Sequence, residues 1–202
     1  MISIIDYGLG NLGSIKNMIE HIDEEAQILS DISLIKHASK FILPGVGAFD
    51  TAMKKIHKID GLYETLNEQI FLKKKPLLGV CLGMQLLMDI SEEGKEKGFG
   101  WINGKVKKFP KKKYLKVPHM GWNTVSFDKE SSLTRGLDRE ARFYFVHSYY
   151  VKPKDKEKSI LSTSYSFNFV SAIQEENIFG VQFHPEKSHS FGMKILKNFS
   201  DF

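Results

Sequence analysis

The sequence predicts an α/β fold with a mixed, largely parallel central sheet flanked by helices and an antiparallel extension in the second half. Over the first 90 residues, short apolar runs alternate with helical patterns, as in parallel sheets covered on both faces. Beyond Gly94, short strand-like runs separated by turn residues favour antiparallel pairing. The 202 residues, 42% hydrophobic and 26% charged, suit a single folded domain over 1–202.

The elements of the first half follow from the spacing of apolar residues. Short continuous apolar runs indicate buried strands, and apolar residues that recur at helical spacing indicate amphipathic helices. In chain order the prediction is a strand over 2–6, a helix over 11–22, strands over 26–29 and 40–43, a helical stretch from 48 toward Phe71, a strand over 76–80 and a helix over 82–90.

In the second half, strand-forming residues gather in short segments bounded by turn residues. These strand-like segments lie within 100–109, 123–127, 142–146, 148–151, 159–163, 169–173 and 178–183. An amphipathic pattern over 190–199 predicts a closing helix. The second half therefore extends the sheet before the last helix covers it.

Composition predicts a soluble, cytoplasmic protein with no membrane contact. The first ten residues lack the charged start and long apolar core of a secretory signal. No apolar run approaches the roughly 18 residues that suggest a membrane helix. The chain has one cysteine, so it forms no internal disulfide, in agreement with a reducing compartment.

The net charge of +5 comes largely from two lysine clusters, at 73–75 and within 105–116. Phe109 and Tyr114 are interleaved with the second cluster, a combination that also occurs in nucleic-acid-binding surfaces. A solvated hairpin, or an edge strand protected by lysines, has the same composition. Because no nucleic-acid-binding motif accompanies the lysines, we expect no nucleic-acid partner.

Residues 8–13, GLGNLG, match the G-x-G-x-x-G pattern of dinucleotide-binding loops and lie between a predicted strand and a predicted helix. Asp31 follows the second strand near the spacing expected for a ribose contact. Glycines are also favoured in any tight strand-to-helix turn, because they adopt positive φ at low cost. The local pattern therefore leaves both a dinucleotide site and a plain turn open.

The single cysteine, Cys81, lies where an apolar strand ends and a helical pattern begins. Gly79 and Gly83 flank it at two residues on either side, the spacing of a nucleophile elbow, in which a strained residue projects its side chain from a sharp turn. The following helix points its positive dipole end at this position, which favours the thiolate. A lone thiol in an apolar stretch can equally pack as a small hydrophobe. A nearby base is needed to decide.

His184 is the best candidate for that base among the seven histidines. It ends a β-rich run, Pro185 favours extended geometry before it, and Glu186 follows two residues later, so both side chains can project from the same side. A thiol, an imidazole and an orienting carboxylate form a triad in any chain order. A structural histidine is the alternative for His184, and more so for His147, which has no acidic neighbour.

Backbone donors for a developing oxyanion are also present. Leu82, directly after the cysteine, can offer its N–H group. The loop 44–47, PGVG, follows another strand at what should be the same carboxyl edge of the sheet, where glycines let the backbone approach a ligand closely. Taken alone, PGVG is also compatible with a plain turn.

Three segments together resemble the class I, triad-type glutamine amidotransferases: LPGVGAF at 43–49, GVCLGMQLL at 79–87 and FGVQFHPEKS at 179–188. Three more are similar to the branch of that family that forms glutaminase subunits of imidazole glycerol phosphate synthases: DYGLGNLGSIKN at 6–17, VPHMGWN at 117–123 and YFVHSYY at 144–150. The resemblance covers nearly the whole chain. It implies the flavodoxin-like sheet of that class and hydrolysis of L-glutamine to glutamate and ammonia.

The resemblance assigns roles to individual positions. It implies that Cys81 is the nucleophile that forms a thioester, that His184 transfers protons and that Glu186 orients His184. The residues implied in the oxyanion hole are Val46, Gly47 and Leu82. The residues implied in glutamine binding are Gly47, Gln85, Glu93, Ser148 and Tyr149, the last two through their backbone. No metal and no separate cofactor is implied.

The resemblance also implies a heterodimer with a (β/α)8-barrel cyclase, which receives ammonia and makes imidazole glycerol phosphate and an aminoimidazole carboxamide ribotide in histidine biosynthesis. The positions that match partner-facing residues of the family are Asn11, Trp122, Asn123 and Lys187. The GLGNLG loop is then part of the subunit interface. Gly13 occupies a position at which relatives more often carry a larger or basic residue.

Three other functions stay open at this point. A paralogous subunit could keep the same chemistry and supply ammonia to a barrel that aminates surface sugars. A non-catalytic scaffold could regulate the barrel, although it would have no chemical need for the three triad residues. A nicotinamide enzyme would use the GLGNLG loop and would bind a dinucleotide as an isolated chain.

Overall fold

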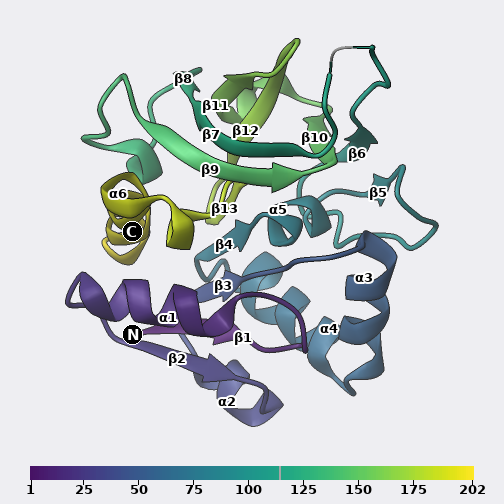
Figure 1. Ribbon diagram of the computed structural model, residues 1–202. Helices are drawn as coiled ribbons and strands as arrows, with labels where there is room; N and C mark the ends of the chain where they lie inside the picture. The colour runs from purple at the N-terminus through teal and green to yellow at the C-terminus, as the bar shows by residue number, and fades with distance from the viewer. Residues whose placement is uncertain (114) are drawn as a thin grey trace.

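The computed structural model describes residues 1–113 and 115–202; Tyr114, one of the two aromatic residues interleaved with the lysines, lies outside this range. A long mixed sheet runs through both halves of the chain (Figure 1). Its strands in spatial order are β2 (Ala26–Leu29), β1 (Ile2–Ile5), β3 (Phe41–Leu43), β4 (Leu77–Val80), β13 (Ile178–Val181), β12 (Asn168–Glu175), β10 (Tyr149–Pro153), β6 (Gly104–Lys108) and β5 (Ile90–Ser91).

Strands β2 to β13 in this order are parallel, and antiparallel pairing begins where β13 meets β12. Strand β11 (Ser159–Ser164) pairs with β12, and β8 (Ser126–Phe127) pairs with β11. A separate two-stranded sheet joins β7 (His119–Thr124) to β9 (Arg142–His147) in antiparallel register. The predicted parallel sheet with an antiparallel extension is confirmed.

Helices cover both faces of the parallel part. The helices are α1 (Leu12–His21), α2 (Ile32–His37), α3 (Phe49–Lys58), α4 (Leu62–Leu66), α5 (Leu82–Leu86) and α6 (His189–Ser200). A π-helical turn η1 (Asn67–Leu72) follows α4, and short 3₁₀ turns occur at η2 (Ser132–Thr134), η3 (Lys156–Lys158) and η4 (Pro185–Lys187).

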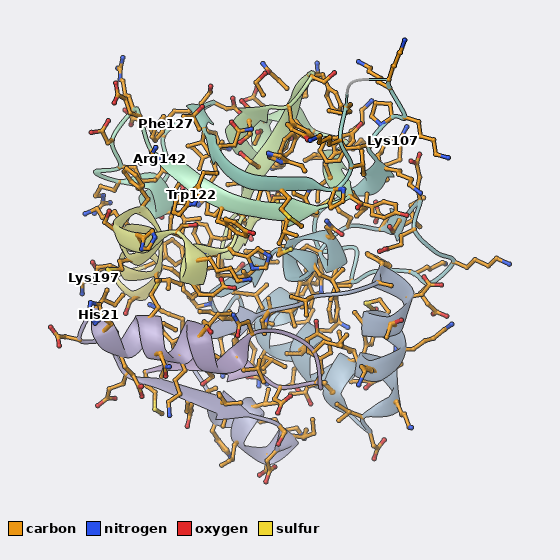
Figure 2. The ribbon with its side chains drawn as sticks, in the orientation of Figure 1. His21, Lys107, Trp122, Phe127, Arg142 and Lys197 are labelled. Atoms are coloured by element: carbon orange, nitrogen blue, oxygen red, sulfur yellow. The ribbon has the colours of Figure 1, made fainter. Side chains whose placement is uncertain are left out.

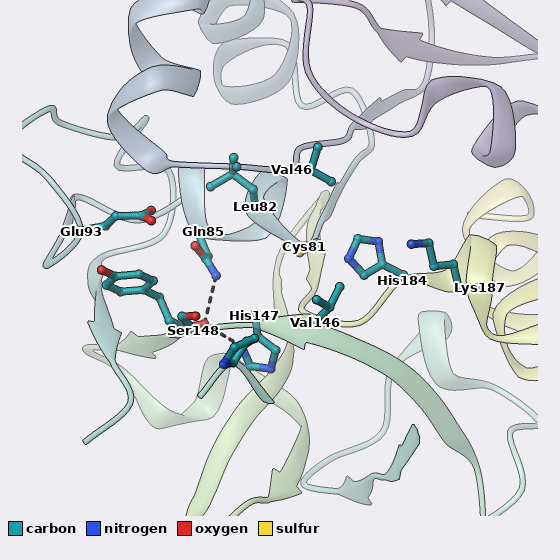
Figure 3. Close-up of a pocket in the computed structure, with 13 residues that line it drawn as sticks. Val46, Cys81, Leu82, Gln85, Glu93, Val146, His147, Ser148, His184 and Lys187 are labelled. Atoms are coloured by element: carbon teal, nitrogen blue, oxygen red, sulfur yellow. Dashed lines mark hydrogen bonds between the residues drawn. The ribbon is translucent and has the colours of Figure 1, made fainter. Parts of the chain in front are cut away.

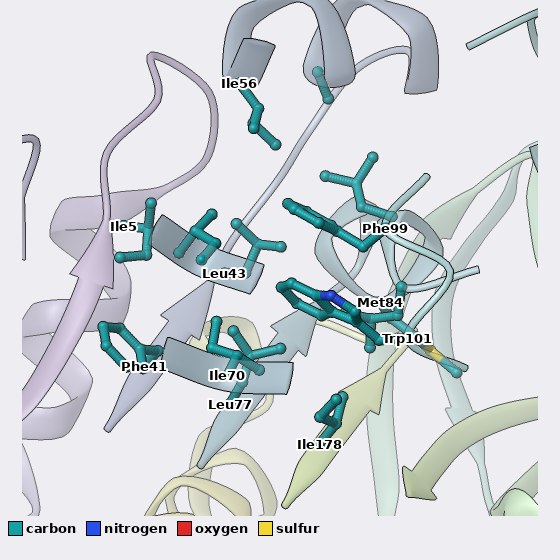
Figure 4. Close-up of a cluster of buried hydrophobic side chains, with 14 of the residues drawn as sticks. Ile5, Phe41, Leu43, Ile56, Ile70, Leu77, Met84, Phe99, Trp101 and Ile178 are labelled. Carbon is teal, nitrogen blue, oxygen red and sulfur yellow. The ribbon is translucent and has the colours of Figure 1, made fainter. Parts of the chain in front are cut away.

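The buried core divides into two clusters, one on each face of the sheet. Helices α2 to α5 pack over one face, where Ile56 and Met84 belong to the same buried cluster as strand residues such as Leu77 (Figure 4). Helices α1 and α6 supply Ile15, Ile195 and others to the opposite face. Residues buried on both sides of a strand explain the continuous apolar runs from which the parallel sheet is predicted.

The predicted helical stretch from 48 toward Phe71 is interrupted. Helix α3 ends at Lys58, and α4 starts after Gly61, which has a φ of +74°. A left-handed residue cannot continue a right-handed helix, and glycine takes this conformation at low cost. The interruption lets the two helices lie against each other.

The predicted helix over 82–90 is too long, because α5 ends at Leu86 and Ile90 already belongs to β5. The segment that follows β5 takes over the carbonyl groups that a longer helix would use. Phe99 N donates to Leu86 O at 2.8 Å, and Ile102 N donates to Leu87 O at 3.1 Å. Tertiary hydrogen bonds therefore override the local helical pattern.

Helix α2 is not among the predicted elements. Asp31, the candidate ribose contact, caps its first turn by accepting hydrogen bonds from the backbone N and side-chain Oγ of Ser33, both at 2.7 Å. A short Asp-x-Ser segment with six helical residues carries too little periodicity to distinguish a helix from a turn. Asp31 thus has a structural role as a helix cap.

Among residues 1–113 and 115–202, none of the helices combines the length and the apolar character needed to cross a membrane.

Candidate active site

Cys81 occupies the sharp turn between β4 and α5. Its φ of 55° and ψ of −108° are unfavourable for a residue with a side chain, and its N–H group donates to Val181 O at 2.8 Å. A Cβ at Gly83 would lie 1.8 Å from Leu43 O, and one at Gly79 would lie 2.7 Å from Gly83 O. The two flanking glycines are therefore required by close backbone contacts, as the nucleophile-elbow hypothesis predicts.

His184 and Glu186 lie just beyond β13, the strand next to β4. The turn η4 brings the Glu186 carboxylate to 2.8 Å from His184 Nδ1, and the two side chains are only 1% and 3% exposed. Nδ1 must donate to this carboxylate, so Nε2 is the nitrogen available for proton transfer. Nε2 is buried without a hydrogen-bond partner among the described residues.

The electrostatics of the pair favour a protonated imidazole. Burial lowers the pKa of His184, but the neighbouring Cys81 sulfur and the Glu186 carboxylate both favour the charged ring and together raise the pKa of His184 to about 10. The ring therefore holds a proton near neutral pH.

A cavity of about 380 Å³ contains most of the predicted site residues (Figure 3). Its lining consists of Val46, Gly47, Cys81, Leu82, Gln85, Glu93, Pro118, Val146, His147, Ser148, Tyr149, His184 and Lys187. Figure 3 shows the His184 ring beside Cys81 and Glu93 at the far end of the same cavity. Residues up to 141 positions apart, Val46 and Lys187, thus share one site.

The PGVG loop forms one wall of this cavity. Gly47 has a φ of +102°, which favours glycine, and a Cβ at Gly45 would lie 2.7 Å from the Tyr7 hydroxyl. The Tyr7 hydroxyl donates to Pro44 O at 2.7 Å and so fixes the start of the loop. Val46 remains 42% exposed at the mouth of the cavity. The loop is therefore a clamped structure and more than a plain turn.

The predicted glutamine-binding side chains have partners that orient them. Gln85 Nε2 donates to Tyr149 O at 3.1 Å and to Gln182 Oε1 at 3.0 Å. Glu93 Oε2 accepts from Phe49 N at 2.8 Å, at the start of α3. One carboxylate oxygen of Glu93 is thereby left for a cationic ligand group.

Besides the lining residues Pro118 and Val146, two residues with polar contacts at this site are absent from the sequence-based prediction. Gln182 Nε2 lies 3.8 Å from Cys81 Sγ, within the range of a weak hydrogen bond to sulfur. Tyr7, within the segment DYGLGNLG, holds the PGVG loop. A glutamine in an apolar strand end and a tyrosine after a strand carry no distinctive local pattern. The position of Gln182 two residues before His184 is the one signal that would have suggested it.

Of the residues predicted to face a partner, Lys187 and Trp122 are exposed, whereas Asn11 and Asn123 are half-buried. Lys187 lines the cavity, and its ammonium group lies 5.6 Å from the centre of the Tyr144 ring. Trp122 is 44% exposed on β7 and stacks at 5.4 Å on His189 (Figure 2). Asn123, also on β7, donates to Ser164 O at 3.0 Å.

The conformation of the GLGNLG loop is explained by contacts within the protein. Gly8 and Gly10 have positive φ values, and a Cβ at Gly10 would lie 2.9 Å from Pro44 Cβ. Asn11 precedes α1 and accepts from Ser14 Oγ at 2.9 Å. Two of the three glycines therefore serve a tight turn against the PGVG loop, whereas Gly13 has open space around it.

The lysine-rich segment contains one aromatic residue that is inaccessible. Phe109 is buried among other aromatic rings, so it is unavailable for stacking on nucleic-acid bases. Lys107 pairs with Glu92 at 3.2 Å, and Lys112 donates to Ser166 Oγ at 3.1 Å. These contacts favour a solvated surface over a nucleic-acid surface, although β6 is flanked by β10 and β5 and is not the outermost strand.

A family model and several similar proteins indicate the same family for this chain. The family model of class-I glutamine amidotransferases matches residues 3–201. Imidazole glycerol phosphate synthase subunit HisH 2 of Methanococcus maripaludis is 53% identical over 199 residues, covering 98% of each chain. The subunit HisH 2 of Pseudomonas aeruginosa is 49% identical with the same coverage, and the subunit HisH of Leptospira borgpetersenii is 44% identical over 99% of each chain.

Solved structures support the fold. A crystal structure of a glutamine amidotransferase aligns with a TM-score of 0.74 at 14% identity and covers 99% of this chain and 97% of the other. PurLQS from Thermotoga maritima aligns with a TM-score of 0.69 at 15% identity, with the same coverage. At such identities the likeness concerns the fold alone. The full-length family match and the relatives at 44–53% identity show that this chain belongs to the class-I glutamine amidotransferases, in the branch of imidazole glycerol phosphate synthase HisH subunits.

Proposed function

We propose that this chain hydrolyses L-glutamine as the glutaminase subunit of an imidazole glycerol phosphate synthase. One observation carries the proposal: Cys81, on a strained elbow, shares a cavity with His184, whose other ring nitrogen is hydrogen-bonded to a buried carboxylate. Nucleophile, proton carrier and orienting group are the components of covalent acyl transfer. No metal is needed for this chemistry.

In the proposed reaction, the Cys81 sulfur attacks the side-chain amide carbon of glutamine, and the carbonyl oxygen becomes an oxyanion. Collapse of this intermediate breaks the C–N bond, and the proton on His184 Nε2 goes to the leaving nitrogen, so that ammonia departs and a thioester remains. His184 then takes a proton from water, which attacks the thioester. Collapse of the second tetrahedral intermediate breaks the C–S bond, glutamate leaves, and the Cys81 sulfur is restored as a thiolate beside the protonated His184.

The oxyanion is stabilised by backbone N–H groups. Leu82 is the first residue of α5, so its N–H has no acceptor within the helix. The Val46–Gly47 peptide on the opposite wall supplies the second donor once a loaded partner is bound, and the positive φ of Gly47 permits the required orientation.

Glutamine itself is held at the far end of the cavity. Glu93 has one free carboxylate oxygen for the α-ammonium group, and Gln85 contacts the substrate amide. The Ser148–Tyr149 backbone faces the same space and binds the α-carboxylate. The amino-acid end of the substrate is thereby recognised by its two charges.

The partner in this proposal is a (β/α)8-barrel cyclase that docks over the cavity mouth. It contacts Asn11, Trp122, Asn123 and Lys187 and receives ammonia through its interior. The printed names of the relatives, subunits of imidazole glycerol phosphate synthase, support such an assembly.

Glutamate release from glutamine, measured with and without the cyclase barrel and its ribulosyl phosphate ligand, tests the proposal. The unmodified chain should release glutamate with the loaded barrel, and Cys81→Ala should not. A chain that releases no glutamate even with the loaded barrel overturns the proposed function. Complementation by Cys81→Ala at low ammonia, equal to that by the unmodified chain, would instead favour a regulatory scaffold.

A second ammonia acceptor is favoured by one observation. The relatives from Methanococcus maripaludis and Pseudomonas aeruginosa both carry names that number them as a second subunit, HisH 2. A second copy can serve a barrel paralogue that aminates sugars for surface polysaccharides. Offering both kinds of barrel to the purified chain and measuring which one stimulates glutamate release distinguishes the two acceptors.

A further inference from the structure

Two buried histidines, His119 and His147, have no part in the proposed chemistry, yet they lie in a continuous hydrogen-bonded chain. Asn123 Nδ2 lies 3.2 Å from His119 Nε2, and His119 Nδ1 lies 3.0 Å from His147 Nε2. His147 Nδ1 lies 2.7 Å from Tyr149 O. The chain therefore runs from β7 across β9 to the start of β10.

Hydrogen-bonding rules fix the direction of every link. A carbonyl oxygen only accepts, so His147 carries its proton on Nδ1 and accepts at Nε2. His119 must then donate from Nδ1, and its Nε2 accepts from the Asn123 amide. Both rings are neutral in this arrangement, and burial lowers the pKa of His119 to about 4 and that of His147 to about 3.

The chain continues from Tyr149 to the candidate nucleophile. Tyr149 O accepts a second hydrogen bond, from Gln85 Nε2 at 3.1 Å, so both of its lone pairs are engaged (Figure 3). Gln85 also donates to Gln182 Oε1, and Gln182 Nε2 lies 3.8 Å from Cys81 Sγ. A change in which ring nitrogen of His147 donates would therefore alter the hydrogen bonds of two glutamine side chains, Gln85 and Gln182, near the thiol.

The other end of the chain lies on β7, where Asn123 is half-buried and the neighbouring residue Trp122 is 44% exposed. His119, Asn123 and Trp122 all belong to β7, and His119 pairs directly with His147 across the two-stranded sheet. Aromatic packing holds the His119 ring in place, because Tyr165 stacks on it at 4.0 Å and Phe145 at 4.8 Å. The link between surface and cavity is thus both directional and rigid.

We infer that His119 and His147 are positioning residues, which connect the β7 surface to the glutamine cavity through the Tyr149 carbonyl. This inference rests on the proposed function. A barrel that presses on β7 shifts the His119 ring, and the hydrogen-bonded chain transmits the shift to the Ser148–Tyr149 backbone and to Gln85. Docking of the barrel and binding of glutamine are thereby coupled.

Two substitutions at His119 separate hydrogen bonding from packing. His119→Phe keeps an aromatic ring against Tyr165 but removes both nitrogens. His119→Asn loses the ring but places an amide nitrogen near the position of Nδ1, from which it can donate to His147 Nε2. A merely structural role predicts that His119→Phe is the better tolerated variant, whereas the coupling role predicts the reverse.

The experiment measures kcat/KM for glutamate release with and without the loaded cyclase barrel, and barrel affinity separately by titration. We expect His119→Phe to reduce the barrel-induced increase in kcat/KM by roughly tenfold, the size of a typical coupling between sites. The affinity for the barrel should stay within about twofold, and His119→Asn should recover part of the increase. If His119→Phe keeps the full increase, or if His119→Asn recovers none, the inference is wrong.

The outcomes are distinguishable from a failure of the proposed function. An unmodified chain that is inactive with the loaded barrel overturns the proposed function, whereas an active chain with an unaffected His119→Phe variant overturns only the coupling. Nitrogen-15 NMR of the isolated unmodified chain adds a test that needs no activity. It should show protonated Nδ1 and unprotonated Nε2 in both rings. A proton on His147 Nε2 would contradict the proposed directions of the hydrogen bonds.

Discussion

The side chain of Glu186 is almost fully buried, yet one of its carboxylate oxygens has no hydrogen-bond partner among the described residues. An ionised carboxylate is retained in such a position only if its charge is compensated, here by the ring of His184 at 2.8 Å. In the proposed triad, its role is to fix the ring and to stabilise the protonated form.

Glu186→Gln should lower the rate of barrel-stimulated glutamate release by about a hundredfold or more, because the neutral amide no longer stabilises the protonated ring. Steady-state kinetics at saturating glutamine measure this effect on kcat. Glu176→Gln is the matched control, since Glu176 is an exposed carboxylate paired with Lys74 at 2.8 Å and should leave the rate unchanged. Equal rates for the two variants would refute the assigned role of Glu186.

The pair of neutral histidines predicts acid sensitivity. Burial lowers the pKa values of His119 and His147 to about 4 and about 3, whereas both are near 6.5 in the unfolded chain. Their contribution to stability is complete well above pH 6.5 and is lost progressively as the pH falls from about 6.5 toward the two folded-state values, because in this window only the unfolded chain gains these protons. His184 has the opposite effect, because its folded-state pKa of about 10 lies above the unfolded value near 6.5, but this single ring is outweighed by the two histidines with lowered pKa values.

Urea unfolding at pH 6.5 and pH 5 checks this expectation. The free energy of unfolding should be smaller at pH 5, and the difference should shrink in His119→Phe, which removes one of the two titrating groups. A free energy of unfolding that is the same at both pH values would show that the rings accept protons without leaving their buried positions.

Single residues differ in how far the sequence predicts their place. Cys81, His184 and Glu186 are predictable because each belongs to a short pattern, with flanking glycines or a Pro–Glu pair. Gln182 and His119 are not, because their partners are 101 and 28 residues away and are brought to them only by strand pairing. Hydrogen-bonded networks between strands leave no trace in local spacing.

At the scale of elements, helix α1 contains a position that is not optimised for helix formation. Gly13 lies in its first turn, and a Cβ there would meet nothing within 4 Å. Gly13→Ala should therefore raise the free energy of unfolding by about 0.5–1 kcal/mol, since alanine loses less backbone entropy on folding.

Urea unfolding of Gly13→Ala measures the gain. Gly83→Ala is the contrasting variant, because its Cβ would lie 1.8 Å from Leu43 O and should prevent the elbow from forming. Destabilisation by Gly13→Ala would mean that this position needs glycine for a reason other than space or helix propensity.

The boundaries of elements are predicted less well than the order of the elements along the chain. Strand β2 has the predicted limits, 26–29, because charged and polar residues end it on both sides. Helix α5 is four residues shorter than predicted, because Phe99 and Ile102 donate to carbonyl groups at its end. A contact with a segment more than ten residues away decides where this helix ends.

At the scale of the whole molecule, the proposed docking face includes an exposed aromatic residue. Trp122 lies on β7 with Arg142 5.9 Å from its ring (Figure 2). Both residues border a hollow that His189 also lines. Exposed tryptophans at interfaces frequently contribute a large share of the binding free energy. Asn123, the first member of the hydrogen-bonded network through His119, is the next residue along β7 and projects to the opposite face of the strand.

Trp122→Ala should therefore weaken binding of the cyclase barrel by about 2 kcal/mol, roughly 30-fold in Kd. Isothermal titration calorimetry of the chain with the barrel measures the affinity. Phe71→Ala is the control, because Phe71 is similarly exposed but belongs to η1, away from the cavity lining. Equal loss in both variants would place the docking face elsewhere.

The overall architecture is largely predictable, since alternation of strands and helices implies a parallel sheet. The spatial order of the strands within the sheet is not predictable in this way. Strand β13, the last in the chain, pairs with β4 in parallel and with β12 in antiparallel, and so joins the two halves of the sheet. Local patterns specify that a segment is a strand but not which neighbours it selects.

The place of β13 in the sheet has a consequence for biosynthesis. Cys81 leaves the ribosome about a hundred residues before His184, and β4 offers an open edge until β13 pairs with it. The sulfur therefore has no proton carrier beside it while the chain is being made. In the proposed mechanism, a chain interrupted before β13 carries the thiol but lacks His184, so translation has to reach the last strand before any ammonia is released.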